Sequence, residues 1–171
     1  MSILLLFSLV LFSLLCSAFF SGMEIAFISS NKLKIELDNN KGEIGAKILS
    51  YFSDKPAWFI ATMLVGNNIA LVIYTLYMAV LLDPYLMAAG LGSSSILLLQ
   101  TIFSTIFILI FAEFLPKAIS RLNPNVILKL FSGILLVFYI LLWPINALVV
   151  YLTIVILLFF VKEDCSDEKV S

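Results

Sequence analysis

Apolar residues run almost without interruption along three stretches of the chain, each long enough to form a membrane-spanning helix. The stretches extend over Ile3 to Ile28, Trp58 to Leu82 and Ser95 to Leu115. About 20 apolar residues in a helix cross the hydrocarbon core of a bilayer. We therefore predict three transmembrane helices. Pro116 is expected to end the third, because proline has no N–H to donate in a helix interior.

The pattern changes between the first two stretches, over 31–55. Apolar residues recur there at helical spacings among charged ones, and Asn39-Asn40-Lys41-Gly42 interrupts the repeat. This pattern predicts two short amphipathic helices that lie against the membrane face. A loop over Asp83 to Ser94, with two glycines, is predicted between the second and third stretches.

A fourth apolar stretch, Val126 to Val161, is longer than one span needs, and Trp143-Pro144 near its middle predicts a break. The stretch fits two short crossings, a bent helix lying partly at the interface, or one tilted span, and the pattern does not choose among them. We take 1–161, with the 31–55 hairpin included, as one all-α transmembrane domain. The polar tail, 162–171, is expected to be disordered.

The distribution of basic residues predicts the orientation. Five lysines lie between the first two stretches and three basic residues follow the third, whereas the N-terminus and the 83–94 loop have none. By the positive-inside rule the N-terminus is outside and the 31–55 hairpin is cytoplasmic. The sequence thus predicts a multi-pass protein of the inner (plasma) membrane of the cell.

The composition supports a membrane domain and excludes several classes of function. Of the 171 residues 63% are hydrophobic and only 12% charged, and the mean hydropathy is +1.15. A net charge of −1 without a basic block argues against a nucleic-acid partner. No histidine occurs, which excludes Ser-His-Asp triads and histidine-based zinc enzymes. We expect the chain not to be an enzyme.

Each of the three predicted spans is interrupted by polar residues. The interruptions are Ser21-Gly22-Met23-Glu24, Gly66-Asn67-Asn68 and Ala112-Glu113-Phe114-Leu115-Pro116-Lys117. A carboxylate or carboxamide at membrane depth costs several kcal/mol unless it is paired, hydrated or bound to an ion. Because the spans alternate in direction, all three interruptions fall in the cytoplasmic half of the membrane. They therefore predict one shared polar site.

The residue types in these interruptions indicate the chemistry of that site. Ser17, Ser21 and Glu24 lie on one face of the first helix. Asn67 lies roughly 13 Å along the second helix from Trp58 and offers a neutral carbonyl oxygen. Interhelical hydrogen bonding is the alternative role for these serines and asparagines.

In the third span, Pro116 frees the carbonyl of Ala112 beside the carboxylate of Glu113. An ion pair between Glu113 and Lys117, four residues apart, is the alternative there. Oxygen ligands without histidine or paired cysteines favour a hard cation, namely Mg²⁺, Ca²⁺ or Na⁺.

These three motifs, in this order and spacing, resemble the transmembrane domain of the CNNM/CorC (hemolysin-like) family of magnesium transporters. The resemblance covers about residues 1 to 160 and implies a homodimer of three-span protomers, with a broken juxtamembrane helical segment after the third span. It also implies Mg²⁺ export, coupled to Na⁺ entry in some members. The family's ion ligands carry over to Ser21, Asn67 and Glu113. We extend the candidate metal site to Gly66, Asn68 and Ala112, with Ser17, Glu24, Pro116 and Lys117 as supporting residues.

The chain departs from the family pattern in ways that suggest an alternative function. Leu71 stands where a second asparagine is usual, and Ala112 where glycine often begins the third motif. The family also carries paired nucleotide-binding CBS modules after the membrane domain, and nothing here corresponds to them. We therefore expect a fragment or a degenerate member, with nucleotide binding only through that other region. A transport-inactive membrane scaffold of the same fold is the alternative.

Overall fold

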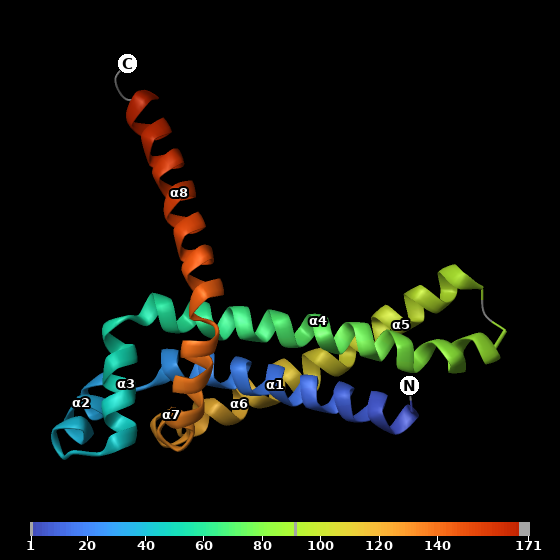
Figure 1. Cartoon of the computed structure of the whole chain (residues 1–171), viewed down its shortest axis with the longest axis horizontal. Helices are drawn as coiled ribbons and strands as arrows, with labels where there is room; N and C mark the ends of the chain where they lie inside the picture. Colours follow the sequence, from blue (N-terminus) through green and yellow to red (C-terminus); the bar gives the residue numbers. More distant parts are fainter. Residues whose placement is uncertain (1, 91, 168–171) are drawn as a thin grey trace.

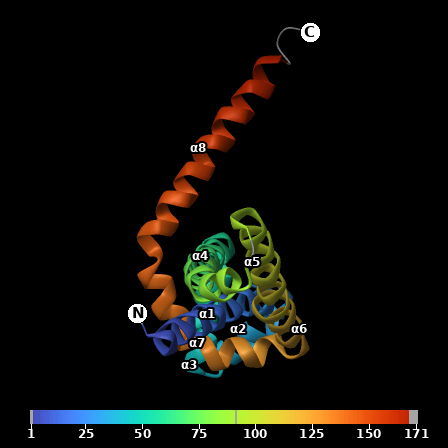
Figure 2. The same cartoon turned by 90° about the vertical axis from the view of Figure 1, so that its right-hand side faces the viewer.

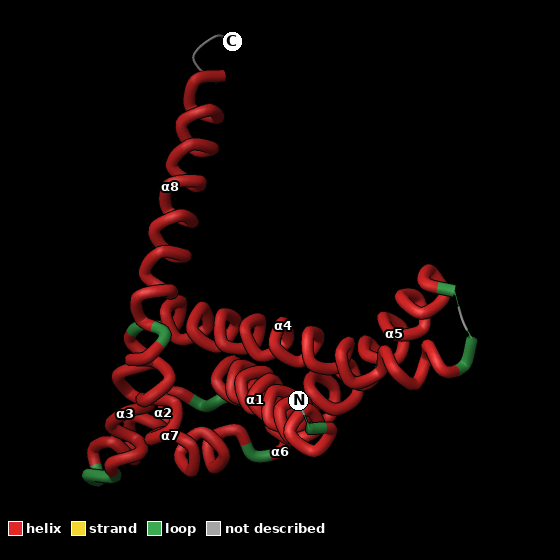
Figure 3. The backbone as a smooth tube through the Cα atoms, turned by 45° about the vertical axis from the view of Figure 1, so that its right-hand side comes forward, coloured by secondary structure: helices red, strands yellow, loops and turns green. Residues whose placement is uncertain are grey.

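The computed structural model describes residues 2–90 and 92–167, and this part of the chain is helical apart from short turns (Figure 3). The predicted all-α membrane fold is confirmed. In chain order the elements are α1 (Ile3–Ser29), α2 (Lys32–Asn40), α3 (Ile44–Asp54), α4 (Pro56–Ala88), α5 (Ser93–Phe107), η1 (Ile108–Phe114), α6 (Leu115–Leu122), α7 (Pro124–Leu141) and α8 (Trp143–Asp167).

The long helices lie side by side, as Figure 1 shows, with α1 and α4 antiparallel and the continuous α5–η1–α6 segment crossing beside them. α1 packs along α4 on one side and against η1 and α6 on the other. It is therefore the central helix of the bundle, and residues on different faces of α1 meet different neighbours. By length and composition α1, α4, α5–α6 and α7 are each apolar enough to cross a membrane.

The third span differs from its prediction. The helix does not end at Pro116 but continues to Leu122, after seven residues of π-helix, η1. In this wider helix the N–H of Leu115 donates to the carbonyl of Ile110, five residues earlier. Pro116 lies just after η1, at the start of α6, and the helix continues through it although Pro116 has no N–H to donate. The prediction was wrong because it considered only the α-helical hydrogen-bonding pattern, whereas the chain changes to a π-helical pattern before Pro116.

The second span is also longer than predicted. α4 extends to Ala88, so the first half of the predicted 83–94 loop is helical and Pro84 lies inside the helix. The turn itself occurs further on, where Gly90 takes a φ of +70°. Left-handed backbone of this kind is accessible to glycine at little cost.

The predicted amphipathic hairpin is confirmed as α2 and α3. The side chain of Asn31 caps α2 by accepting a hydrogen bond from the N–H of Lys34. Gly42, with a φ of +84°, forms the turn that the sequence placed between the two helices. The buried side chains Ile35, Leu49 and Phe52 join the main core, so the hairpin packs onto the end of the bundle.

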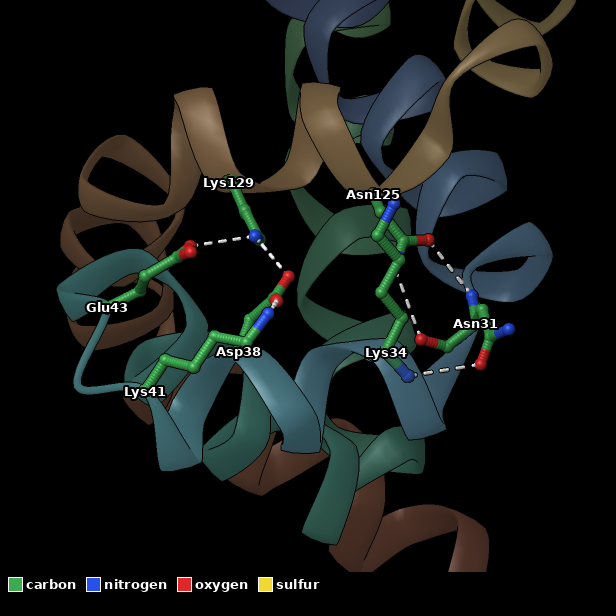
Figure 4. Close-up of polar contacts among 7 residues, drawn as sticks. All are labelled: Asn31, Lys34, Asp38, Lys41, Glu43, Asn125 and Lys129. Carbon is green, nitrogen blue, oxygen red and sulfur yellow. Dashed lines mark hydrogen bonds and ion pairs between the residues drawn. The ribbon is translucent and has the colours of Figure 1, made fainter.

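Two polar connections tie this hairpin to α7 (Figure 4). Lys129 of α7 pairs with the buried Asp38 and, at 2.7 Å, with Glu43. The hydrogen bond from Lys129 holds the pKa of Asp38 below its usual value. Asn125 at the start of α7 accepts from the N–H of Asn31 at 3.0 Å and donates to its carbonyl at 3.2 Å.

The fourth apolar stretch is broken at Leu142, as its Trp-Pro pair predicted. α7, which Figure 1 views nearly end-on, crosses the hairpin end of the bundle, and α8 stands away from it (Figure 2). Asn146 fixes the base of α8 to α4 by donating to the carbonyl of Trp58 and to Thr62 Oγ1, both at 2.9 Å. The helix α8 continues to Asp167, so the tail is helical that far, and 168–171 lie outside the described residues.

Candidate cation site

The closest polar contact between two long helices joins Ser17 of α1 to Asn67 of α4. The hydroxyl of Ser17 donates to Asn67 Oδ1 at 2.6 Å. Ser17 is fully buried and Asn67 half-buried. Asn67 lies roughly 17 Å along α4 from Pro56, at 1.5 Å per residue. The contact therefore lies inside the bundle, nearer to its hairpin end than to its loop end.

A glycine brings the two helices together beside this contact. A Cβ at Gly66 would lie 2.5 Å from Cε1 of Phe20. The ring of Phe20 is itself held edge-to-face by Phe138, with centroids 4.9 Å apart, and by Phe19, at 5.6 Å. Gly66 therefore gives room for an aromatic side chain of α1, a role that the sequence did not reveal.

One helical turn after Ser17, Ser21 is fully buried, and its Oγ has no hydrogen-bond partner within the described residues. Ser13, one turn before Ser17, instead donates to the carbonyls of Leu9 and Val10 in its own helix. A buried hydroxyl without a partner is costly, and native structures contain few of them. Among these serines, Ser21 therefore has the side-chain oxygen that is most available to bind a ligand.

The other face of α1 meets the third span through a second close approach. A Cβ at Gly22 would lie 2.8 Å from Oγ of Ser120 and 3.5 Å from Cβ of Pro116. The small residue at Gly22 thus lets α6 contact α1 one residue after Ser21. Ala112 of η1 is fully buried in the same region of the bundle, because η1 also packs on α1.

The charged groups of the candidate site gather on this second face. Glu113 forms an ion pair with Lys117 at 3.6 Å, and both side chains are about one-third exposed. Glu24 is half-buried and close enough to both for their charges to act on it. Because Glu113 is paired with Lys117, Glu24 supplies the group's further negative charge when it is ionised, and that charge favours a cation nearby.

The structure brings some of the predicted residues together and leaves others apart. Asn67 meets Ser17, and Glu24 lies near Glu113 and Lys117. Asn68 is exposed, on a different side of α4 from Asn67. α4 packs little against η1, so the Asn67 and Glu113 sides of the site are connected through α1.

Sequence reasoning missed the direct role of Ser17, which it had placed behind Ser21. The signal was present, because Ser17 and Ser21 share one helix face, but spacing does not say which of them faces α4. It also missed Asn146, a single amide in an apolar stretch that is now seen to be fully buried against Thr62. An isolated asparagine in such a stretch is itself a signal of a buried polar contact.

Chemically, this arrangement offers neutral oxygens on one side of α1 and carboxylates on the other. Within the described ranges, no three acidic, cysteine or histidine side chains converge as a metal-binding group. A cation held here would depend on hydroxyl, amide and backbone oxygens with one carboxylate. Such a mixed oxygen set is of the kind that binds hard cations.

Comparisons with known proteins agree with the helical membrane fold. Residues 8–171 match the family described as the cyclin M transmembrane N-terminal domain. The chain is 28% identical over 136 residues to the UPF0053 protein MG146 homolog of Mycoplasma pneumoniae, covering 77% of this chain and 31% of that protein. It is 26% identical over 145 residues to a UPF0053 protein of Haemophilus influenzae, covering 82% and 33% respectively. It is also 28% identical over 109 residues to the UPF0053 inner membrane protein YfjD of Escherichia coli, covering 64% and 24%. The chain thus spans a third or less of the length of these relatives.

Proposed function

We propose that this chain, which belongs to the cyclin M transmembrane N-terminal domain family, is the membrane domain of a cation transporter. Its substrate is Mg²⁺, exported in exchange for Na⁺. The ion binds between α1 and its two neighbours, at Ser21 and Asn67 on one side and Glu113 on the other.

The observation that carries this proposal is the Ser17–Asn67 hydrogen bond with the unpartnered Ser21 one turn away. The amide oxygen of Asn67 is already fixed by Ser17, so it needs little reorganisation to face an ion. Ser21 supplies a buried oxygen whose cost of burial is relieved when it ligates. A purely structural polar contact would not need the second, unpartnered hydroxyl.

The third span supplies the charge in this proposal. Glu113 contributes a carboxylate when its ion pair with Lys117 opens, and Glu24 adds negative charge nearby. The end of the π-helix η1 supports this role. Pro116 has no N–H, so it cannot donate to the carbonyl of Ala112 in an α-helical pattern or to that of Phe111 in a π-helical pattern, and these backbone oxygens lack that donor beside Glu113. π-helical segments of this kind are frequent at functional sites.

The rest of the arrangement is proposed on the same basis. The positive-inside distribution favours an outside N-terminus and a cytoplasmic α2–α3 hairpin. The protein acts as a homodimer in the bilayer, with α7 and α8 at the cytoplasmic face rather than across the membrane. This placement of α7 is favoured because it crosses the hairpin end of the bundle in Figure 1.

Calorimetric titration of Mg²⁺ into the purified chain in detergent tests the site. We expect saturable binding that weakens at least tenfold in Asn67→Ala and in Glu113→Ala, because each removes one ligand. Asn68→Ala is the matched control. It removes the same group from the adjacent, exposed position, and its binding should equal that of the unaltered protein. Absence of binding from a folded chain would refute the proposal, as would equal binding in all three variants.

Two observations favour a second candidate function, a membrane scaffold that retains the fold without transport. Glu113 has its own partner in Lys117, and Leu71, one turn after Asn67, has no oxygen to offer. Under this hypothesis the polar residues only hold the helices together. If the calorimetric titration shows no binding to the folded chain, the scaffold is the function that the result supports.

A further inference from the structure

An aromatic pocket lies where α3, α4, α7 and α8 meet, at the hairpin end of the bundle (Figure 1). Its volume is about 470 Å³. Both tryptophans of the chain line it, together with two tyrosines and two charged residues: Trp58, Trp143, Tyr51, Tyr139, Asp54 and Lys55. The two charged residues directly precede the apolar helix α4, and tryptophan and tyrosine gather at the level of the lipid headgroups in membrane proteins. The aromatic pocket therefore lies where a headgroup can reach it.

The inner wall of the aromatic pocket is held by contacts within the protein. Tyr139 is only 7% exposed, and the ring of Phe52 packs against it with centroids 5.1 Å apart. Tyr51 stands nearly perpendicular to Tyr139, at 87°, with 6.1 Å between the centroids. Trp58 is fixed through its backbone, because its carbonyl accepts a hydrogen bond from Asn146 at 2.9 Å. A ligand therefore meets aromatic side chains that need little rearrangement to bind it.

The aromatic lining is suited to a cation. An aromatic ring attracts a cation placed over its face, and tryptophan does so most strongly. One such contact is already present, since Lys55 Nζ lies 5.2 Å from the centroid of the Tyr51 ring. The other three aromatic residues of the lining remain for a cation from outside, and Asp54 adds a carboxylate to the same lining. An ammonium group bound here gains both kinds of contact.

The same pocket also offers groups that bind an anion. Within the described residues, neither Asp54 nor Lys55 forms an ion pair with another side chain, so both charges are available. Ala57 and Trp58 line the pocket at the start of α4, where the helix has no side-chain cap. The ammonium of Lys55 beside these backbone N–H groups favours a phosphate. The lining is thus complementary to a ligand that carries both a phosphate and an ammonium.

We propose that the aromatic pocket binds the headgroup of a zwitterionic phospholipid. Its phosphate lies at Lys55 and the start of α4, and its ammonium lies among Trp58, Trp143 and Asp54. A phospholipid fits better than a soluble zwitterion, because exposed apolar side chains follow Trp143 along α8: Ile145, Leu148 and Leu152. The inference goes beyond the proposed function and holds whether or not the chain transports Mg²⁺.

Tryptophan fluorescence tests the proposal with the full chain, because both tryptophans line the aromatic pocket. The chain is reconstituted in bilayers of phosphatidylglycerol with brominated acyl chains, which quench tryptophan on contact. Unbrominated phosphatidylethanolamine is then compared with unbrominated phosphatidylglycerol for the fluorescence that it restores. Both lipids carry a phosphate, and only phosphatidylethanolamine carries an ammonium. We expect it to be preferred at least fivefold, because one cation–π contact at a partly exposed ring contributes a factor of about two to five.

Two variants identify the groups that recognise the ammonium. Asp54→Asn should bring the preference close to one, because it removes the carboxylate from an exposed position and keeps the shape of the side chain. Asp83→Asn is the matched control at the other end of α4, and it should keep the full preference. Trp143→Leu should also lower the preference, read from Trp58 alone, because it removes one aromatic ring and leaves an apolar side chain.

Three results would overturn the proposal. The first is equal restoration of fluorescence by the two lipids in the unaltered chain, which would leave the aromatic residues as interfacial anchors only. The second is a preference that Asp54→Asn and Asp83→Asn keep alike. The third is loss of the preference when free phosphoethanolamine is added, because the ligand would then be a soluble zwitterion instead of a lipid. A preference that is lost only in the pocket variants supports the headgroup site, even if the calorimetric titration shows no Mg²⁺ binding.

Discussion

Replacing Gly66 by alanine tests whether close packing of α1 on α4 forms the candidate site. The added Cβ would lie 2.5, 2.6 and 2.8 Å from Cε1, Cζ and Cδ1 of Phe20. The ring has little freedom to move, since Phe19 and Phe138 contact it edge-to-face. The two helices must therefore separate, and the 2.6 Å hydrogen bond between Ser17 and Asn67 must lengthen or break.

The expected destabilisation follows from two opposing effects. Overpacking a tight core costs typically about 1–3 kcal/mol. Alanine gains about 1 kcal/mol over glycine in a helix interior, because less backbone entropy is lost on folding. We expect a net loss of between 0 and about 2 kcal/mol in the free energy of unfolding, together with weaker Mg²⁺ binding.

Reversible unfolding in mixed detergent micelles measures this loss. Gly133→Ala in α7 is the control, since its Cβ would have no neighbour within 4 Å, and it should stabilise the protein by up to about 1 kcal/mol. Phe20→Leu combined with Gly66→Ala should recover part of the loss, giving a coupling energy of about 1 kcal/mol. A Gly66→Ala protein that is stabilised as much as Gly133→Ala would refute the close-packing argument.

Two further predictions concern the charged groups. The hydrogen bond from Lys129 lowers the pKa of Asp38 in the folded state. The stability that Asp38 contributes is therefore complete above its unfolded pKa of about 3.9, and it is lost as the pH falls through the lower folded pKa. Unfolding measured from pH 7 to pH 3 should therefore show a loss of stability in acid that is smaller in Asp38→Asn, and identical slopes would contradict this reasoning. Lys117→Gln should tighten Mg²⁺ binding about twofold, because it removes the ammonium that pairs with Glu113 in a partly exposed ion pair of small energy. Weaker calorimetric binding in this variant would show that Lys117 supports the site instead of competing for it.

Features with a local cause were predictable from the sequence. The α2–α3 hairpin was recognised because amphipathic spacing and the glycine turn at Gly42 are encoded over a few residues. The break between α7 and α8 was recognised because proline cannot donate in a helix interior. The three polar motifs predicted one shared site because side chains of this kind are costly in lipid. The structure joins Ser17 to Asn67 and brings Glu24 near Glu113, and the shared site stays a prediction.

Features that depend on contact between distant segments were not predictable in this way. Whether Ser17 or Ser21 meets Asn67 depends on how α1 is rotated against α4, which the periodicity does not fix. The role of Gly66 follows from Phe20, a residue 46 positions away that carries no polar signal. The helix continued past Pro116 because η1 changes the hydrogen-bonding register, and register is decided by packing on α1 as much as by local sequence.

The helix α8 is anchored to the bundle near its N-terminal end. Asn146 ties the base of this helix to α4, and α7, which precedes it, is tied to the hairpin that joins α1 to α4. A change in tilt between α1 and α4 would therefore also move the base of α8. A 25-residue helix is roughly 37 Å long, so a tilt of about 10° at its base moves its far end by roughly 6 Å. Because α8 is long and held near its base, a rotation there would displace its far end more than any other part of the helix.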